Sequence, residues 1–372
     1  FGKQMKRIQG WNYLSEYDEL RDTILSAVDD VCRSGQLILG ERVATLEAEM
    51  ASYIGVSETG IGVNSGTDAL FIALKSLGIG PGDEVVTVAN TAVPTVSAIV
   101  SIGATPKFID VDAATYLMDC DQLTAALTPQ TACILPVHLF GQCADMTKIK
   151  KIAKQHNLFV LEDCAQSTGA TFDGKKSGQF GDLGAFSFYP TKLLGAYGDG
   201  GMILTNSAKL QDKCRQLRMY GMEGSYYAEE HGYNSRLDEV QAAILSIKLK
   251  SLDDTILRRR QLAARYFEKL KNTDLVLPVE ADANQHAYYL YVVRHPERDR
   301  LIDAMAKQDI HLNISYPHPV SLMNGYAYLG YQEGDLPVTE KLAKEIFSLP
   351  MYPGLTDDEQ DRVCDALQGL VK

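Results

Sequence analysis

Residues 159–163 read FVLED, and residues 186–201 read FSFYPTKLLGAYGDGG. The first run is a short apolar stretch that ends in two acids, Glu162 and Asp163. It lies between about residues 60 and 206, where short apolar runs alternate with helical patterns. Such alternation predicts parallel strands joined by crossover helices, and therefore an α/β core with functional residues at the carboxyl ends of its strands.

The same patterns divide the whole chain. We expect strands at 61–64, 84–89, 106–111, 132–139 and 158–162, and helices at 15–53 (with a break at Ser34-Gly35), 66–77, 145–156 and 237–271. Residues beyond 275 read as a smaller α+β unit with a strand over 287–293. We therefore predict a large domain with N-terminal helices at 1–250 and a small C-terminal domain at 251–372.

Composition excludes several classes of protein. The net charge of −12 argues against a nucleic-acid partner, because phosphate backbones require clustered Lys and Arg. No apolar run approaches the roughly 18 residues of a membrane span, and the N-terminal stretch FGKQMKRIQGWNYL lacks the apolar core of a signal peptide. The seven cysteines are scattered and form no CxxC pair. We expect a cytoplasmic protein without a metal site.

Lys192 lies between aromatic residues, Pro190 and a glycine-rich stretch. Desolvation in such a setting lowers the pKa of an amine and makes it a nucleophile toward carbonyls. Asp163, about thirty residues earlier, could hold a pyridinium nitrogen and keep it protonated. Together the two residues predict an enzyme that uses pyridoxal 5'-phosphate (PLP), with the lysine as the Schiff-base residue.

The run Asn64-Ser65-Gly66-Thr67-Asp68 follows a predicted strand and opens a predicted helix. Free N–H groups at a helix start, with Gly66 permitting close approach and a hydroxyl on Thr67, form an anion site. A simple N-cap by Ser65 or Thr67 explains the same residues. With a PLP lysine elsewhere, the phosphate interpretation is favoured.

Other polar residues also have two interpretations. Ser187 is either an ordinary strand serine or a phosphate contact, and Gln166 is either a helix-start residue or the neighbour of the cofactor's ring hydroxyl. His138 follows an apolar run and is expected to be a hydrogen-bonded core histidine. His318, in the stiff loop Tyr-Pro-His-Pro, is a candidate pocket residue. The consecutive arginines 258–260 are expected to form a solvated helix face.

Four longer segments, in this order, resemble the DegT/DnrJ/EryC1/StrS family of sugar aminotransferases. They are NSGTDAL (64–70), PVHLFGQCADM (136–146), LEDCAQSTGATFDGKKSGQFGDLGAFSFYPTKLLGAYGDGG (161–201) and GYNSRLDEVQAAIL (232–245). The resemblance extends over essentially the whole chain. It implies an aspartate-aminotransferase-type fold (PLP fold type I) with a three-layer core, and a homodimer with active sites at the interface.

The resemblance also implies a role for each site residue. Lys192 and Asp163 would be the Schiff-base lysine and the pyridinium partner. Gln166 would lie beside the ring hydroxyl, and Asn234 would reach the phosphate of the other subunit's cofactor. The remaining phosphate ligands would come from Ser65, Gly66, Thr67 and Ser187. L-glutamate would load the cofactor with an amine, which a nucleotide-linked ketosugar would then accept.

The context of Tyr189-Pro190 and residues 196–199 resembles the branch that aminates carbon 3. The implied acceptor is a dTDP-linked 3-keto-6-deoxyhexose, in the biosynthesis of a deoxyaminosugar for a surface polysaccharide or a glycoside. Tyr189, Tyr226 and His318 are the candidate substrate contacts. Three residues depart from the family pattern: Ala92 replaces a ring-stacking aromatic, Ser225 a lysine and Ser321 a histidine.

Four alternatives stay open at this point. A carbon-4 aminotransferase would differ in the segment before the lysine, and a sugar dehydratase would replace Lys192 with histidine. A PLP enzyme acting on free amino acids, such as a desulfurase, would need a reactive-cysteine loop, and none stands out. A non-catalytic regulatory protein of the same fold would have little reason to bury an intact lysine and acid.

Overall fold

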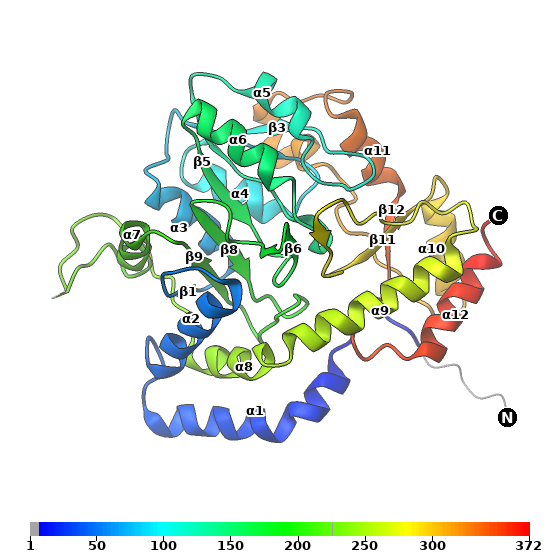
Figure 1. Cartoon of the computed structure of the whole chain (residues 1–372), viewed down its shortest axis with the longest axis horizontal. Coiled ribbons are helices and arrows are strands. Elements are labelled where there is room, and N and C mark those ends of the chain that lie inside the picture. Colours follow the sequence, from blue (N-terminus) through cyan, green and yellow to red (C-terminus); the bar gives the residue numbers. More distant parts are fainter. Residues whose placement is uncertain (1–6, 225) are drawn as a thin grey trace.

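The computed structural model describes residues 7–224 and 226–372. Its centre is a seven-stranded sheet of order β1-β9-β8-β5-β4-β2-β3 (Figure 1). The strands are β1 (Ile61–Val63), β2 (Glu84–Val88), β3 (Thr105–Ile109), β4 (Thr131–Ile134), β5 (Phe159–Asp163), β8 (Leu183–Ser187) and β9 (Gly201–Leu204). β3, β2, β4, β5 and β8 pair in parallel, whereas β9 runs antiparallel to β8 and β1. The predicted α/β core is confirmed.

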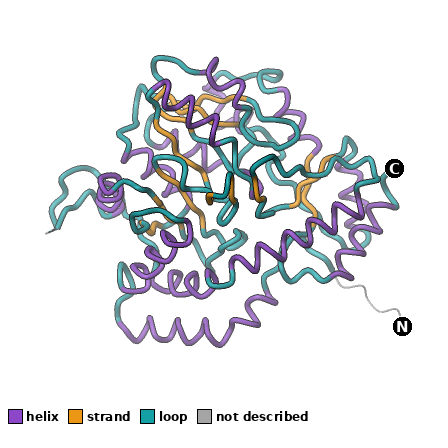
Figure 2. The backbone as a smooth tube through the Cα atoms, in the orientation of Figure 1, coloured by secondary structure: helices purple, strands orange, loops and turns teal. Residues whose placement is uncertain are grey.

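Helices cover both faces of this sheet, as its strand sequences require. All residues of β8 are buried, because crossover helices shield a parallel sheet from water on both sides. In Figure 1, α6 lies in front of the sheet and α3 and α4 lie behind it; Figure 2 shows the strands surrounded by helices. The helices of this part are α1 (Leu14–Ser34), α2 (Glu41–Ile54), α3 (Gly66–Ser76), α4 (Val93–Ser101), α5 (Leu123–Ala126), α6 (Met146–His156), α7 (Ala208–Arg218) and α8 (Glu239–Leu249), with 3-10 turns at Cys120–Gln122 and Leu139–Gly141.

The sheet brings distant parts of the sequence to one edge. β5 ends at Asp163, which pairs in parallel register with Ala185 of β8, and β8 ends at Ser187. α3, which begins at Gly66 directly after the β1 turn, packs against β8 and β9. The carboxyl ends of β5 and β8 and the start of α3 therefore meet at the same place.

A second hydrophobic core lies toward the C-terminus. It is built around the antiparallel pair of β11 and β12 and contains Tyr266, Tyr291, Phe347 and Val363. The elements of this part are α9 (Leu252–Leu270), β11 (Tyr291–Arg294), α10 (Arg298–Ala306), α11 (Pro337–Glu345), β12 (Ile346–Leu349) and α12 (Asp357–Gln368), with 3-10 turns at Val320–Leu322 and Asn324–Leu329. A small sheet of β10 (Asn284–Gln285), β6 (Thr171–Phe172) and β7 (Lys175–Lys176) lies beside the large one.

Helix α9 belongs to both cores. Leu252 and Ile256 pack in the core of the large sheet, whereas Leu262 and Tyr266 pack in the C-terminal core. Figure 1 shows it running from α8 to the C-terminal part as one long helix. The predicted domain boundary near residue 250 falls at its start, and the division into two domains stays a prediction.

Two expected strands are shorter than their apolar runs. The run 132–139 gives β4, which ends at Ile134, and then only an isolated bridge at Val137, because Pro136 between them has no N–H to donate to a ladder. The strand expected at 287–293 begins at Tyr291 instead. The preceding residues donate their N–H groups to the loop at Phe140 and Gly141, so they do not continue the β11 ladder. Within the described ranges, no helix combines the length and apolarity of a membrane span.

Candidate active site

The turn between β1 and α3 is capped by Ser65. Its Oγ accepts a hydrogen bond from the N–H of Asp68 at 3.1 Å, so the N-cap interpretation of this serine is confirmed. The N–H groups of Gly66 and Thr67 lie in the first helical turn, which no intrahelical acceptor reaches. The start of α3 can therefore still bind an anion.

The end of β8 closes against this turn. A Cβ added to Gly66 would lie 2.6 Å from the Cβ of Ser187, and one added to Gly201 would collide with the backbone oxygen of Ser65. Only glycine permits so close an approach at these two positions. The Oγ of Ser187 accepts from the N–H of Tyr189 at 3.3 Å and keeps its own proton for an acceptor. The predicted phosphate residues Gly66, Thr67 and Ser187 thus share one corner.

Asp163 is buried at the end of β5. Its carboxylate accepts hydrogen bonds from Thr95 Oγ1 at 2.8 Å and from the N–H of Ala165 at 3.1 Å. Burial raises the pKa of this carboxyl, and the two hydrogen bonds and the positive charge of Lys192 oppose that rise. A cation beside Asp163 would further stabilise its charged form.

Lys192 lies in the loop that follows β8 and is half-buried. Its Nζ lies 4.8 Å from the centroid of the Tyr289 ring, within cation–π range. The hydroxyl of Tyr289 is held by Thr191 Oγ1 at 3.0 Å. The lysine amine is therefore positioned on an aromatic surface and lies within electrostatic reach of Asp163.

Gln166 joins the large sheet to the C-terminal part. Its Oε1 accepts from the N–H of Phe140 at 2.7 Å, and its Nε2 donates to the hydroxyl of Tyr316. Tyr316 also stacks on the ring of Phe140, with centroids 6.1 Å apart. Burial raises the pKa of the Tyr316 phenol, which therefore stays protonated.

Beneath Asp163 lies a buried pair of His138 and Glu162. His138 Nε2 lies 2.8 Å from Glu162 Oε2, and His138 Nδ1 accepts from the N–H of Ala144. The same carboxylate accepts from the N–H groups of Gly178, Phe180 and Gly181. His138 is confirmed as a hydrogen-bonded core histidine. Among the described residues, His138, Glu162 and Cys164 have the spacing of metal ligands, but backbone donors already use the oxygens of Glu162.

The candidate substrate residues are exposed in the single chain, and of them Tyr189 adjoins Lys192, whose N–H its backbone oxygen accepts at 2.9 Å. Tyr189 is 53% exposed, Tyr226 is 93% exposed, and His318 is exposed on its loop. Tyr226 belongs to the loop after α7 that projects from the body in Figure 1. Ser225 lies outside the described residues. Asn234 is exposed too, and its backbone oxygen accepts from Asn64 Nδ2 at 3.0 Å, beside the turn between β1 and α3 of the same chain.

The other departures and the arginine run can also be placed. Ala92 is the half-buried N-cap residue of α4, and Ser321 is buried.

The expectation of a solvated arginine face is wrong for Arg259, which is 3% exposed. Its Nη1 donates to three backbone oxygens, those of Tyr288, Tyr289 and Met351. Burial lowers the pKa of the Arg259 guanidinium to about 10.

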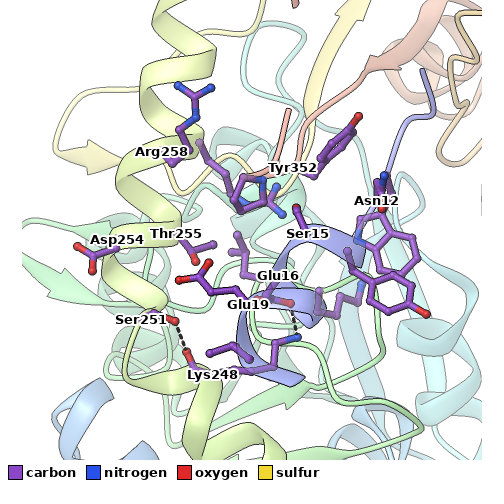
Figure 3. A pocket seen from close by; sticks show the side chains of 18 of the residues that line it. Asn12, Ser15, Glu16, Glu19, Lys248, Ser251, Asp254, Thr255, Arg258 and Tyr352 are labelled. Carbon is purple, nitrogen blue, oxygen red and sulfur yellow. Dashed lines mark hydrogen bonds and ion pairs between the residues drawn. The ribbon is translucent and has the colours of Figure 1, made fainter. Parts of the chain in front are cut away.

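Two cavities adjoin the lysine loop. One, of about 440 Å³, is lined by Lys192, Trp11, Lys248 and Arg258; Figure 3 shows it between α1 and α9, with Lys248 pointing to Glu16. Lys248 Nζ and Glu16 Oε2 are 2.9 Å apart. The other, of about 420 Å³, reaches Thr191, Tyr289 and Tyr316. Sequence patterns did not indicate Thr95, Tyr289, Tyr316 or Trp11, since each is brought to the site by contacts between residues far apart in the chain.

Comparison with known proteins agrees with this geometry. Residues 18–368 match the DegT/DnrJ/EryC1/StrS aminotransferase family, and the chain belongs to it. A dTDP-3-amino-3,4,6-trideoxy-alpha-D-glucose transaminase of Micromonospora megalomicea subsp. nigra is 53% identical, over 97% of this chain and 98% of that protein. A "pleiotropic regulatory protein" of Geobacillus stearothermophilus is 46% identical over 95% of each chain. The crystal structure of S. venezuelae DesV in complex with a ketimine intermediate superposes with a TM-score of 0.96 at 39% identity, covering 98% of this chain and 99% of that one.

The chain is therefore a PLP-dependent nucleotide-sugar aminotransferase with the predicted aspartate-aminotransferase-type fold. Its own residues fit the cofactor. The corner of Gly66 and Ser187 offers the N–H groups at the start of α3 and the Ser187 hydroxyl to a phosphate, and Asp163 is a buried carboxylate that a ring cation would stabilise. Lys192 brings an amine within electrostatic reach of Asp163.

Proposed function

We propose that this enzyme transfers an amino group from L-glutamate to carbon 3 of a dTDP-linked 3-keto-6-deoxyhexose. The observation that carries the proposal is the placement of Lys192 and Asp163 beside the anion corner, in a chain 53% identical to a dTDP-3-amino-sugar transaminase. The name of the Geobacillus relative suggests a regulatory protein as the alternative. A purely regulatory protein, however, gains nothing from desolvating Asp163, which costs free energy unless a cation is bound.

The residues divide the chemical work as follows. Bound PLP supplies an electron sink for negative charge at the reacting carbon of the substrate. Asp163 holds positive charge at the ring nitrogen, and Thr95 and Ala165 keep its carboxylate oriented. Lys192 Nζ, 4.8 Å from the centroid of the Tyr289 ring, would be the base that removes a proton at the reacting carbon of the amino donor and the acid that delivers a proton to the reacting carbon of the ketosugar. The hydrogen bond between Gln166 and Tyr316 holds these two side chains in place as another wall of the site.

We further propose that the active unit is a homodimer with shared sites. The loop after α7 carries Tyr220, Tyr226 and Tyr227, which are 43%, 93% and 64% exposed. Exposed aromatic side chains on a projecting loop are typical of a surface that a partner covers. In a dimer this loop could bring Tyr226 to the partner's ketosugar, with Asn234 at the partner's cofactor phosphate.

The test is a panel of dTDP- and UDP-linked 3-keto and 4-keto sugars, each incubated with PLP-loaded protein and L-glutamate, with products identified by mass. We expect amination of dTDP-linked 3-ketosugars, and no turnover by Lys192→Ala. Exclusive amination of 4-ketosugars would assign the protein to the carbon-4 branch instead. Failure with every ketosugar, despite bound PLP, would favour the regulatory alternative.

Substrate contacts can be separated from cofactor contacts by measuring the two half-reactions. Tyr226→Phe and His318→Ala should raise the KM for the ketosugar and leave the glutamate half-reaction unchanged. Equal damage to both half-reactions would mean that these residues support the cofactor or the fold.

A further inference from the structure

The cavity that reaches Thr191 has an outer wall built by the N-terminal segment. Ile8 donates its N–H to the oxygen of Asp309 at 2.9 Å, and His311 donates its N–H to the oxygen of Ile8 at 2.8 Å. Ile8 and Ile310 are both buried by this short parallel pairing. Because side chains alternate along extended backbone, their neighbours Arg7 and His311 face the other way. Both line the cavity.

The inner wall of this cavity belongs to the catalytic site. It includes Tyr289, whose ring carries the Lys192 amine, and Tyr316, whose hydroxyl accepts from Gln166. Thr191, next to the lysine, lines it as well. A small molecule in the cavity would therefore lie between Arg7 and Tyr289, the residue whose ring contacts the Lys192 amine. Its volume of about 420 Å³ is in the usual range for small-ligand sites.

The charge of this cavity is opposite to that of the whole chain. No Asp or Glu occurs among the described residues that line it, although the net charge of the protein is −12. The neighbouring cavity in Figure 3 is lined by three acids, Glu16, Glu19 and Asp254, together with the cations Lys192, Lys248, Arg258 and Arg259. Two of those cations are already paired, Lys248 with Glu16 and Arg258 with Asp357. The first cavity has Arg7 and no acid among its described lining residues, which favours an anion there.

We propose that this cavity is the subsite that recognises the anionic group of the substrates, with Arg7 and His311 as its charged and N–H donors. The group is either a carboxylate of the amino donor or the diphosphate of the sugar nucleotide. A guanidinium forms paired hydrogen bonds with either anion. Asn313 and Ser315, which also line the cavity, add neutral donors. The inference rests on the proposed function, since it assumes that these substrates react at Lys192.

The test is equilibrium binding to the PLP-loaded protein, measured by isothermal titration calorimetry. Two probes are used: glutarate, a dicarboxylate without a reactive amine, and dTDP, which carries the diphosphate without the sugar. Arg7→Gln should raise the Kd about tenfold for at least one probe, the effect of losing one charge-assisted hydrogen bond. Weakened glutarate binding identifies the donor carboxylate, and weakened dTDP binding identifies the diphosphate. Arg7→Lys should restore part of the loss.

Arg300→Gln is the matched control, because Arg300 is an exposed arginine of α10 that pairs with Glu297. It should leave both Kd values unchanged. The inference is overturned if Arg7→Gln binds both probes like the wild type, if the wild type binds neither, or if Arg300→Gln weakens binding equally. If the wild type aminates ketosugars while Arg7→Gln keeps both affinities, only this inference fails. If no ketosugar is aminated, the proposed function fails.

Discussion

Replacing Gly66 by alanine tests the phosphate corner directly. Alanine in a helix is normally better than glycine by up to about 1 kcal/mol. Here its methyl group would lie 2.6 Å from the Cβ of Ser187 and 3.1 Å from the Ser187 Cα and Oγ. Carbon atoms in contact are about 3.5–4.0 Å apart, so the start of α3 and the end of β8 must separate by about 1 Å.

That separation affects both stability and cofactor binding. Overpacking of this kind costs about 1–3 kcal/mol, which exceeds the gain in helix propensity. A shift of about 1 Å also exceeds the tolerance of a hydrogen bond, so the phosphate loses at least one charge-assisted contact from Gly66, Thr67 or Ser187. Such a contact is worth about 1.5–3 kcal/mol, which corresponds to PLP binding that is about 10- to 100-fold weaker.

The assay is titration of PLP-free protein with PLP, followed by visible absorbance, together with the Tm of the PLP-free form. Gly325→Ala is the control, because a Cβ at Gly325 meets nothing within 4 Å and its φ is not in the left-handed region. The control should bind PLP like the wild type. If Gly66→Ala also binds PLP with unchanged affinity and Tm, the corner does not hold the phosphate.

Three further changes address other parts of the site. Asp163→Asn should retain PLP but slow both half-reactions. Burial raises the pKa of Asp163, so its charge destabilises the PLP-free wild type at pH 7, and the PLP-free variant should have the higher Tm there. The difference in Tm should disappear below about pH 4, where the carboxyl is protonated in both the folded and the unfolded protein. A lower Tm at pH 7, or slowing of the sugar half-reaction alone, would contradict this role. Mixed dimers of Lys192→Ala and Asn234→Ala should recover part of the activity that each variant lacks, measured after subunit exchange, and no recovery would count against a shared site. Arg259→Met should lower the unfolding free energy by about 3 kcal/mol, because three backbone oxygens lose their donor, whereas Arg258→Met should cost less than about 1 kcal/mol in the same denaturation assay.

Short stretches of sequence were sufficient to predict those features of the site that depend on neighbouring residues. The cap at Ser65, the burial of Asp163 at a strand end and the setting of Lys192 each follow from a few neighbouring residues. Hydrophobic periodicity predicted strands β1 to β5 and helices α3 and α6, but no strand was expected at β8 or β9 and no helix at α4 or α7. The family segments then set the fold type, the cofactor and the sugar-nucleotide chemistry.

Contacts between distant residues could not be predicted in this way. Gln166 and Tyr316 are 150 positions apart, and no pattern in the sequence near either residue predicts their contact. Arg259 looked solvated because its neighbours are charged, whereas its guanidinium lies under the backbone of the segment at 288–289. The strand expected from 287 began late for a similar reason, since the loop at Phe140 competes for the same N–H groups.

The sharing of α9 between the two cores limits where this chain can change in length. An α-helix turns by about 100° per residue. One residue inserted between Ile256 and Leu262 would leave the first half of α9 in place and rotate the second half, so that Leu262 and Tyr266 would leave the core they now fill. The phase of α9 is therefore fixed from both ends, and insertions should instead be tolerated at exposed turns such as Gly330–Gly334.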